Sequence, residues 1–374
     1  MKKLLIIINF DQGLQARNEI INQLEKSEYE LYFAAPDTGY LKQLKAEGYS
    51  SYNVKINRRG LNPIQDFFLL ISYFLLILRI SPDIVLSFTV KPNIYGGVAC
   101  RVLRVPQIAN ITGLGDAVEN PGILQKLVLN LTKVALKRTR TIFFQNTSNK
   151  KFYEQLSLIS AKQTKLLPGS GVNLEKHFYI SYPKKDDTIR LVFIGRIMRD
   201  KGIEELINAF LIIHTNHSSV TCDIVGPFEE DSYRNLIDSY LATGAGVYLG
   251  VSSDIHTMLS EYNAVVLPSY HEGMSNVLLE AAATGRPVLA SNVPGCRETF
   301  DEGISGFGFE PRSVDSLVQA IERFIAIPHE QKAAMGLAGR KKMEREFDRQ
   351  IVVDAYMREI ENILEENNRK DKKK

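Results

Sequence analysis

The sequence predicts an α/β protein of two domains, each built on a parallel β-sheet that is wound on both sides by helices. Short apolar runs of the length of a buried strand recur along the chain, and a helical pattern follows each of them. This alternation is typical of βαβ units. The chain has 374 residues, which is about two to three times the usual size of a domain. Because the alternation runs through twice, we expect two hydrophobic cores.

Composition narrows the class of protein. Hydrophobic residues make up 44% of the chain, charged residues 24% and aromatic residues 9%, values that exclude a disordered tail or a fibrous protein. The net charge of +3 is too small for capture of nucleic acid by the whole molecule. Cys100, Cys222 and Cys296 lie far apart without metal-ligand spacing, which indicates a reduced, cytoplasmic protein.

In the first half, the apolar run after Met1 is too short for a signal peptide and predicts a buried strand. Residues 67–78 are uncharged and mostly apolar, yet a membrane span needs about 20 residues. They predict a buried or membrane-surface helix. The predicted strands are Leu4–Ile8, Leu31–Ala35, Ile84–Phe88, Gln107–Ile111 and Ile142–Phe144.

Turn formers and charged residues at 168–171 and 182–187 predict the hinge between the domains. The first domain is expected over 1–168 and the second over 169–346. Residues 347–366 carry a helical apolar period and predict a strap that returns to the first domain, before a frayed basic tail at 367–374. The predicted strands of the second domain are Leu191–Ile194, Cys222–Val225, Val247–Leu249, Ala264–Leu267 and Pro287–Ala290.

A cationic loop follows the first strand of the second domain. Gly195 and Arg196 come directly after that strand, and Lys201 and Gly202 precede a helix that begins near Ile203. Ligands of open α/β sheets bind at the carboxyl ends of the strands, where a helix N-terminus attracts anions. The two cations either clamp a diphosphate from two directions or lie solvated on a surface loop.

Two glutamates follow a later strand of the same domain. Glu272 is expected at the tip of a loop, Ser275 at the N-cap of the next helix, and Glu280 inside that helix. Carboxylates accept hydrogen bonds from sugar and ribose hydroxyls, and the backbone amides at 274–276 can hold a phosphate. Alternatively, Glu280 is solvated or salt-bridged. His271 either orients Glu272 or is a structural residue of the loop.

Together these motifs resemble the retaining nucleotide-sugar glycosyltransferases of GT-B fold, family 4. The resemblance covers the whole chain and is stronger in the second half. In detail it is closest to bacterial enzymes, N-acetylgalactosaminyltransferases among them, that extend undecaprenyl-diphosphate-linked sugars in capsule and glycan biosynthesis. The motifs that carry it are Gly195-Arg196, Lys201-Gly202, Glu272 with Glu280, and Gly285-Arg286-Pro287, with 168–173, Thr112-Gly113-Leu114-Gly115 and 293–298 in support.

The resemblance implies two Rossmann-like domains that face a cleft, with the acceptor bound by the first domain and a nucleotide sugar, most often a UDP-sugar, by the second. Arg196 and Lys201 would neutralise the donor's diphosphate, and Glu280 would bind the ribose. Glu272, with the backbone amides that follow, would hold the transferred sugar, which keeps its anomeric configuration. Arg196, Lys201 and Glu272 are the expected catalytic residues, and the expected donor-binding set is Gly195, Arg196, Lys201, Glu272, Gly273, Met274, Ser275, Asn276 and Glu280.

In the first domain, the expected acceptor-binding residues are Gly13, Arg17, Thr112 and Gly113. The pair Gly113-x-Gly115 lacks the third glycine of a dinucleotide fingerprint, because Val118 stands there. Many relatives carry a donor-sugar histidine after this strand, but no histidine precedes His177 here, so that Asn110 or Thr112 would take its role. We expect no cofactor, and no D-x-D pair indicates a metal site.

Residues 123–145, in addition to the apolar run at 67–78, indicate contact with a membrane. Residues 123–145 hold five cations and no acidic residue, interleaved with apolar positions, which predicts a basic amphipathic helix suited to an anionic leaflet. The run at 67–78 would lie beside it. Alternatively, both helices simply cover the sheet. The cations are Lys126, Lys133, Lys137, Arg138 and Arg140.

The resulting hypothesis is a peripheral glycosyltransferase on the cytoplasmic face of the membrane. It would move a hexose or N-acetylhexosamine from a nucleotide sugar to a polyprenyl-diphosphate-linked saccharide. Two alternatives remain: a nucleotide-sugar epimerase or hydrolase of the same fold, and a non-catalytic carbohydrate- or lipid-binding subunit.

Overall fold

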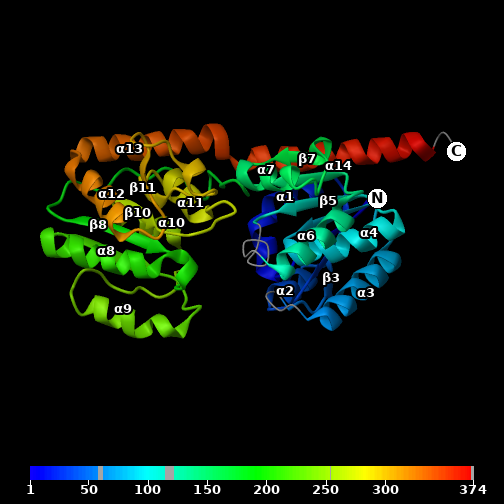
Figure 1. Ribbon diagram of the computed structural model, residues 1–374. Helices are drawn as coiled ribbons and strands as arrows, with labels where there is room; N and C mark the ends of the chain where they lie inside the picture. The colour runs from blue at the N-terminus through cyan, green and yellow to red at the C-terminus, as the bar shows by residue number, and fades with distance from the viewer. Residues whose placement is uncertain (58–61, 114–121, 253, 372–374) are drawn as a thin grey trace. The chain divides into compact units, whose positions relative to one another are not determined.

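A computed structural model describes residues 1–57, 62–113, 122–252 and 254–371, and it divides the chain into two compact units (Figure 1). Unit 1 consists of Met1–Ser170 together with Gln350–Lys374. Unit 2 consists of Gly171–Arg349. The chain therefore leaves unit 1, forms unit 2 and then returns to unit 1.

Unit 1 is built on a seven-stranded parallel sheet of order β3-β2-β1-β4-β5-β6-β7. The five predicted strands are confirmed as its centre. The two edge strands were not predicted, because they are short and carry few apolar residues. The strands are β1 (Lys3–Ile7), β2 (Glu30–Ala35), β3 (Ser50–Asn53), β4 (Ile84–Phe88), β5 (Gln107–Ile111), β6 (Thr141–Phe144) and β7 (Thr164–Leu166).

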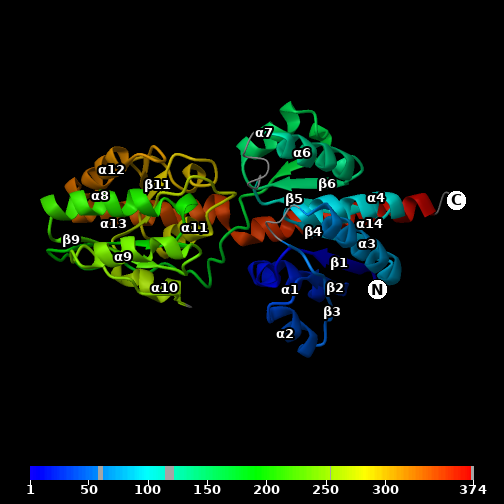
Figure 2. The same ribbon diagram turned by 60° about the horizontal axis from the view of Figure 1, so that its bottom comes forward.

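Helices cover both faces of this sheet (Figure 2). Side chains of α3 and α4 pack on one face against Leu5 and Ile7, and α6 packs on the same face farther along. Helices α1, α2 and α14 pack on the other face against Leu4 and Ile6. The helices are η1 (Asp11–Arg17), α1 (Asn18–Lys26), α2 (Tyr40–Ala46), α3 (Pro63–Ile80), η2 (Pro92–Gly96), α4 (Gly97–Leu103), α6 (Ile123–Leu136), α7 (Thr147–Gln155), η3 (Ala161–Gln163) and α14 (Arg349–Asp371).

Helix α3 contains the apolar run at 67–78. It begins at Pro63, because the Asn62 side chain accepts a hydrogen bond from the amide of Ile64 at 3.0 Å and caps the helix. It ends where Ser81 adopts a left-handed conformation, with φ of 51°. By length and composition alone it is long and apolar enough to cross a membrane, and 28% of it is buried.

The basic segment at 123–145 is a helix only as far as Leu136. The prediction of one continuous helix was wrong at its C-terminal end. Arg138 and Arg140 lie instead in the turn that leads into β6. Thr139 in that turn is buried and donates a hydrogen bond to Gln107 Oε1 at 2.8 Å, which ties the turn to the sheet.

Helix α14 is the C-terminal strap. Its apolar residues complete the core on one face of the unit 1 sheet, and Val352, Tyr356 and Ile360 are buried there. The Tyr356 hydroxyl accepts a hydrogen bond from the side-chain nitrogen of Asn110 at 2.6 Å. The helix continues to Asp371, beyond the predicted end of the strap at 366.

Unit 2 is built on a five-stranded parallel sheet of order β12-β11-β10-β8-β9. Four of the predicted strands are confirmed, but Val247–Leu249 is not a strand. Val247 and Leu249 are exposed, and only an isolated bridge joins Tyr248 to Ile224. The strands are β8 (Ile189–Ile194), β9 (Val220–Val225), β10 (Ala264–Leu267), β11 (Val288–Ser291) and β12 (Gly306–Phe309).

The helices of unit 2 pack against this sheet around one apolar cluster that includes Phe210, Leu278 and Phe324. They are η4 (Arg199–Lys201), α8 (Ile203–Asn216), η5 (Asp231–Tyr233), α9 (Arg234–Leu241), α10 (Ile255–Met258), η6 (Leu259–Glu261), α11 (Asn276–Thr284), η7 (Arg297–Thr299), α12 (Val314–Ala326), α13 (His329–Lys342) and η8 (Met343–Phe347).

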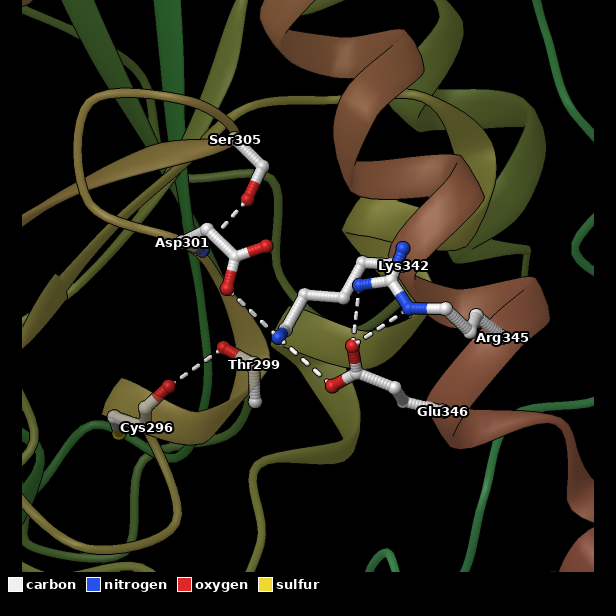
Figure 3. Close-up of polar contacts among 7 residues, drawn as sticks. All are labelled: Cys296, Thr299, Asp301, Ser305, Lys342, Arg345 and Glu346. Carbon is white, nitrogen blue, oxygen red and sulfur yellow. Dashed lines mark hydrogen bonds and ion pairs between the residues drawn. The ribbon is translucent and has the colours of Figure 1, made fainter.

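A polar clamp fixes the end of α13 to the segment before β12 (Figure 3). The Lys342 ammonium donates to Asp301 Oδ1 and to Glu346 Oε2, each at 2.9 Å, while its own side chain is buried. Burial works against its charge, but the two carboxylates outweigh burial and raise the pKa of Lys342. The Asp301 amide in turn donates to Ser305 Oγ.

Candidate functional site

Two loops of unit 2 lie in contact at the carboxyl edge of its sheet. The loop after β8 holds Lys201 and Gly202, and the loop after the neighbouring strand β10 runs from Pro268 to the start of α11. The Tyr270 amide donates to the carbonyl of Asp200 at 2.9 Å. A Cβ atom at Gly202, whose φ is 68°, would lie 2.1 Å from the carbonyl oxygen of Pro268. Only glycine permits this approach.

Lys201 and Glu272 form an ion pair between these two loops. Lys201 Nζ lies 2.5 Å from Glu272 Oε1, and the Ser269 hydroxyl donates to the same oxygen at 3.0 Å. The two side chains are only 18% and 14% exposed, so the pair is partly shielded from water. The sequence analysis predicted a separate role for each residue, and the structure shows that their side chains are paired.

Arg196 lies near the start of the same loop after β8 that holds Lys201. Gly195 and Arg196 directly follow β8, and the Gly195 amide donates to the carbonyl of Val225 at the end of β9. The Arg196 guanidinium lies 3.5 Å from Glu229 Oε2, and its side chain is 44% exposed. Glu229 comes from the loop after β9, and no sequence pattern singled it out. The Arg196 guanidinium is therefore accessible at this edge.

Glu280 lies on α11 and is half-buried. Burial raises the pKa of Glu280 above its ordinary value, although Arg349 and Lys176 oppose the shift. Its Oε1 atom lies 3.9 Å from His177 Nε2, and burial lowers the pKa of His177 to about 4. The His177 ring, which stacks edge to face on His256, is therefore neutral at neutral pH. The prediction that Glu280 lies among apolar positions agrees with this burial.

The start of α11 is seated on a third loop. Ser275 is the N-cap residue, but its side chain makes no capping hydrogen bond. Its amide donates to the carbonyl of Gly295 at 2.9 Å, and a Cβ atom at Gly295 would lie 2.6 Å from the carbonyl oxygen of Glu272. The Ser275 amide is thus already occupied by protein. The Met274 side chain lies in an apolar cluster with Leu279.

Gly273 and Asn276 complete the expected donor-binding set. Gly273 lies in the same loop, and Asn276 is the first residue of α11, where the positive end of the helix favours an anion. The structure thus brings Lys201, Glu272 and this helix start to one edge. Arg196 lies at the same edge of the sheet, directly after β8, and Glu280 follows farther along α11.

The sequence did not predict the burial of two residues of unit 2, Arg286 at the amino edge of the sheet and Cys296 at the carboxyl edge. Arg286 is fully buried, and its guanidinium donates to the carbonyls of Leu259, Ile180 and Ser181, among others. Burial lowers the pKa of Arg286 to about 10. Cys296 is buried close to Glu272, and burial raises the pKa of its thiol well above the ordinary value. The sequence showed both residues within motifs but gave no sign of their burial.

In unit 1, the expected acceptor residues lie at the carboxyl edge of the sheet. The Arg17 guanidinium donates to the Gly13 carbonyl and lies 4.2 Å from the centre of the Phe88 ring. Gly13 is packed, since a Cβ atom there would lie 2.6 Å from Ile8 Cδ1. Thr112 directly follows β5.

Gly113 ends the described segment, and a Cβ atom there would meet nothing within 4 Å. Leu114, Gly115 and Val118 of the predicted loop lie outside the described residues. The side-chain nitrogen of Asn110 is bonded to Tyr356, and Thr112 is half-buried. Among the residues that the structure describes, no group of three or more histidine, cysteine or acidic side chains is arranged to hold a metal ion.

Two family models match this chain. The model described as glycosyl transferases group 1 matches residues 178–342, and the model described as glycosyl transferase 4-like matches residues 3–146. The first lies within unit 2 and the second within unit 1. Together they account for most of the chain.

Three curated relatives are similar over most of their length. The chain is 26% identical to N,N'-diacetylbacillosaminyl-diphospho-undecaprenol alpha-1,3-N-acetylgalactosaminyltransferase of Campylobacter jejuni, over 93% of this chain and 95% of the relative. It is 26% identical to the capsular polysaccharide biosynthesis glycosyltransferase CapM of Staphylococcus aureus, over 98% of each chain. It is 26% identical to UDP-Gal:alpha-D-GlcNAc-diphosphoundecaprenol alpha-1,3-galactosyltransferase of Escherichia coli, over 80% of this chain and 81% of the relative.

Solved structures show the same fold at lower identity. A glycosyltransferase of Rickettsia africae superposes with a TM-score of 0.79 at 16% identity, over 97% of this chain and 98% of that chain. HepE of Anabaena, in a complex with UDP, superposes with a TM-score of 0.78 at 16% identity, over 97% of this chain and all of the other.

Proposed function

Because this chain is a glycosyltransferase of GT-B fold, we propose that it transfers a sugar from a UDP-linked donor to a polyprenyl-diphosphate-linked saccharide, with retention of configuration. The transferred sugar is a hexose or an N-acetylhexosamine. Support for this acceptor class comes from the relatives, two of which act on sugars linked to undecaprenyl diphosphate. Support for the base comes from the galactosyltransferase, which uses UDP-Gal, and from the structural neighbour that holds UDP.

The contact of Lys201 with Glu272 at the edge shared with Arg196 is the observation that carries the proposal. A nucleotide sugar that reacts leaves as a nucleoside diphosphate, on which negative charge increases. Fixed cations next to that diphosphate stabilise the transition state more than the ground state. Arg196, exposed at the edge, and Lys201, farther along the same loop after β8, both approach the diphosphate.

In this proposal Glu272 has two functions. It holds the Lys201 ammonium in place through one carboxylate oxygen, and its second oxygen accepts a hydrogen bond from a hydroxyl of the transferred sugar. Glu280 accepts hydrogen bonds from the ribose hydroxyls, and the start of α11 faces a donor phosphate. The bond between the anomeric carbon and the diphosphate oxygen breaks, the acceptor hydroxyl forms the new bond, and a diphosphate oxygen takes its proton.

We also propose that the protein works as a peripheral protein on the cytoplasmic face of the membrane. The outer face of α3 supports this location, because its large apolar side chains recur at helical spacing and are exposed to solvent. A stripe of this kind can enter the boundary between head groups and acyl chains. The exposed residues of the stripe are Ile64, Phe67, Phe68, Ile71, Leu75 and Leu78.

The test is release of UDP from a UDP-sugar in the presence of a lipid-linked acceptor. Arg196→Ala and Lys201→Ala each lower kcat/KM about 10- to 150-fold, because charge-assisted contacts to the diphosphate are lost. Arg234→Ala is the control, since Arg234 is exposed and pairs with Asp231 on the surface of the same unit. If both site variants stay within a few-fold of the wild type, the diphosphate assignment is wrong. If UDP is released equally without acceptor, the enzyme is a hydrolase or an epimerase.

A further inference from the structure

A cavity lined by four arginines lies at the amino edge of the unit 1 sheet, and we infer that it binds the phosphate of an anionic phospholipid head group. The inference rests on the proposed membrane location. The cavity measures about 270 Å³, enough for a phosphodiester group. Its lining includes Arg101, Arg104, Arg138 and Arg140 together with Val105 and Pro106.

This cavity is separate from both proposed substrate sites. Arg104 and Pro106 precede β5, and Arg138 and Arg140 precede β6. In a parallel sheet the residues before the strands lie at one edge and those after the strands lie at the other. Thr112, which follows β5, is therefore at the opposite edge. The four arginines of the cavity therefore do not belong to the proposed acceptor-binding or donor-binding site.

The charge of the cavity is not balanced by its lining. No carboxylate lines it within the described part of the chain, and only Arg140 is ion-paired, with Glu366. Arg101 donates to the Val134 carbonyl at 2.8 Å, whereas Arg104 and Arg138 are exposed. The C-termini of α4 and α6 lie here, and each carries about half a negative charge at most. Two such ends do not offset the three guanidinium groups other than that of Arg140.

The surroundings favour a lipid over a soluble phosphate. Val102, next to Arg101, is 63% exposed, and Val134 is 49% exposed. Helix α4 packs against both α3 and α6 on the same face of the sheet, so the cavity lies in the same helical layer as the exposed stripe of α3. A phosphate held in a forked guanidinium site beside apolar surface matches a lipid whose acyl chains continue into the bilayer.

The experiment is co-sedimentation of the full chain, without substrates, with vesicles of phosphatidylcholine alone or mixed with phosphatidylglycerol. The double variant Arg104→Gln/Arg138→Gln loses about 10- to 30-fold in affinity for the mixed vesicles. Lys42→Gln/Lys45→Gln removes the same charge from α2, on the other face of the sheet, and changes this affinity less than threefold. Arg104→Lys/Arg138→Lys keeps the charge but recovers only part of the binding, because an ammonium does not reproduce the planar fork. Thermal melting checks that each variant is folded.

Three results would overturn the inference. In the first, the glutamine variant binds mixed vesicles like the wild type. In the second, the α2 control loses as much affinity. In the third, the wild type binds vesicles of phosphatidylcholine alone as tightly as mixed vesicles. UDP release with a short-chain, water-soluble acceptor tests the glycosyltransferase proposal separately from the lipid site. The glutamine variant retains wild-type turnover in that assay, because the cavity is not at the substrate edge.

Discussion

Lys201 Nζ lies 2.5 Å from Oε1 of Glu272, and this contact joins the loops after two neighbouring strands of unit 2. The same carboxylate oxygen also accepts a hydrogen bond from the hydroxyl of Ser269. A cation that is held in this way cannot move freely toward a ligand, so its position is fixed before the donor arrives. Such preorganisation is what makes a fixed charge effective in a transition state. The two residues should therefore act as one unit.

A double-mutant cycle tests that unit. We expect Lys201→Met and Glu272→Gln each to lower kcat/KM by about 10- to 150-fold. The kcat/KM of the double variant should be little lower than that of the less active single variant. The reason is that each substitution already displaces the partner. Steady-state UDP release measures all four proteins, and Arg323→Gln with Glu302→Gln, an exposed pair, serves as the control cycle. Simple additivity at the site would contradict the shared role.

The second prediction concerns pH and Glu280. Its pKa is raised by burial, so the folded protein holds this proton at a pH where the unfolded chain has lost it. The contribution of Glu280 to stability is thus most favourable at acid pH and is lost as pH rises through the raised pKa. A protonated carboxyl also accepts ribose hydroxyls less well. We expect UDP affinity to weaken as pH falls through this range.

Calorimetric titration of UDP across pH, with Glu280→Gln, checks this prediction. The variant should bind UDP more weakly at neutral pH, lose that part of the pH dependence, and melt no lower than the wild type, because a buried charge has been removed. A variant that keeps the full pH dependence would show that another group titrates. His177→Gln tests the neighbouring ring, whose pKa is lowered to about 4 by burial.

The third prediction concerns the clamp of Lys342. Lys342→Met leaves the carboxylates of Asp301 and Glu346 facing each other without their shared cation (Figure 3). We expect a loss of about 1–3 kcal/mol in the free energy of unfolding, which corresponds to a fall in Tm of about 2–4 °C for each kcal/mol in a unit of this size. Calorimetric melting measures it. Arg323→Gln breaks an exposed pair and should cost less than about 1 kcal/mol.

Acid pH should reduce the difference between Lys342→Met and the wild type. Burial acts to raise the pKa of Glu346, but Lys342 and Arg345 outweigh it and hold that pKa below its ordinary value. Stability from this carboxylate is present above its ordinary pKa and is lost as pH falls through the lowered one. If melting of the variant and the wild type differed equally at acid and neutral pH, the clamp would not be electrostatic.

The fourth prediction concerns Arg286, which is fully buried and donates to backbone carbonyls, among them those of Leu259, Ile180 and Ser181. Arg286→Met leaves these carbonyls without their donors. We expect about 3–5 kcal/mol of destabilisation, read from denaturant unfolding. Arg286→Lys should recover only part of it, because an ammonium does not reproduce the planar fork. Arg234→Met, on the surface, is the matched control, and equal stability of the two methionine variants would contradict this role.

The sheet centres could be predicted from sequence because strands such as Ile84–Phe88 and Ala264–Leu267 are buried on both faces and leave an uninterrupted apolar run. The edge strand Ser50–Asn53 leaves no such run, because it is only half-buried. At Gly306–Phe309 every second residue is glycine, which is typical of a turn. Val247–Leu249 shows the opposite error, since an apolar run there lies exposed in a loop.

The loops of the site could be located because they follow predicted strands, but their contacts could not. The Lys201 contact with Glu272 depends on how closely Gly202 approaches Pro268, a distance set by the sheet order. The partner of Arg196, Glu229, comes from a loop without a motif. The burial of Arg286 results from the packing of segments distant in sequence, which no local pattern records.

Helix α14 has a consequence for how the protein is made. Residues of the last helix fill the core beneath strands that the ribosome completes first, and Tyr356 closes over Asn110 there. The early part of the nascent chain thus leaves one side of its sheet uncovered until α14 has been synthesised. Unit 2, in contrast, contains all of the strands of its own sheet. We infer that the later unit matures before the earlier one, and that a premature stop codon near residue 349 spoils the beginning of the protein rather than its end.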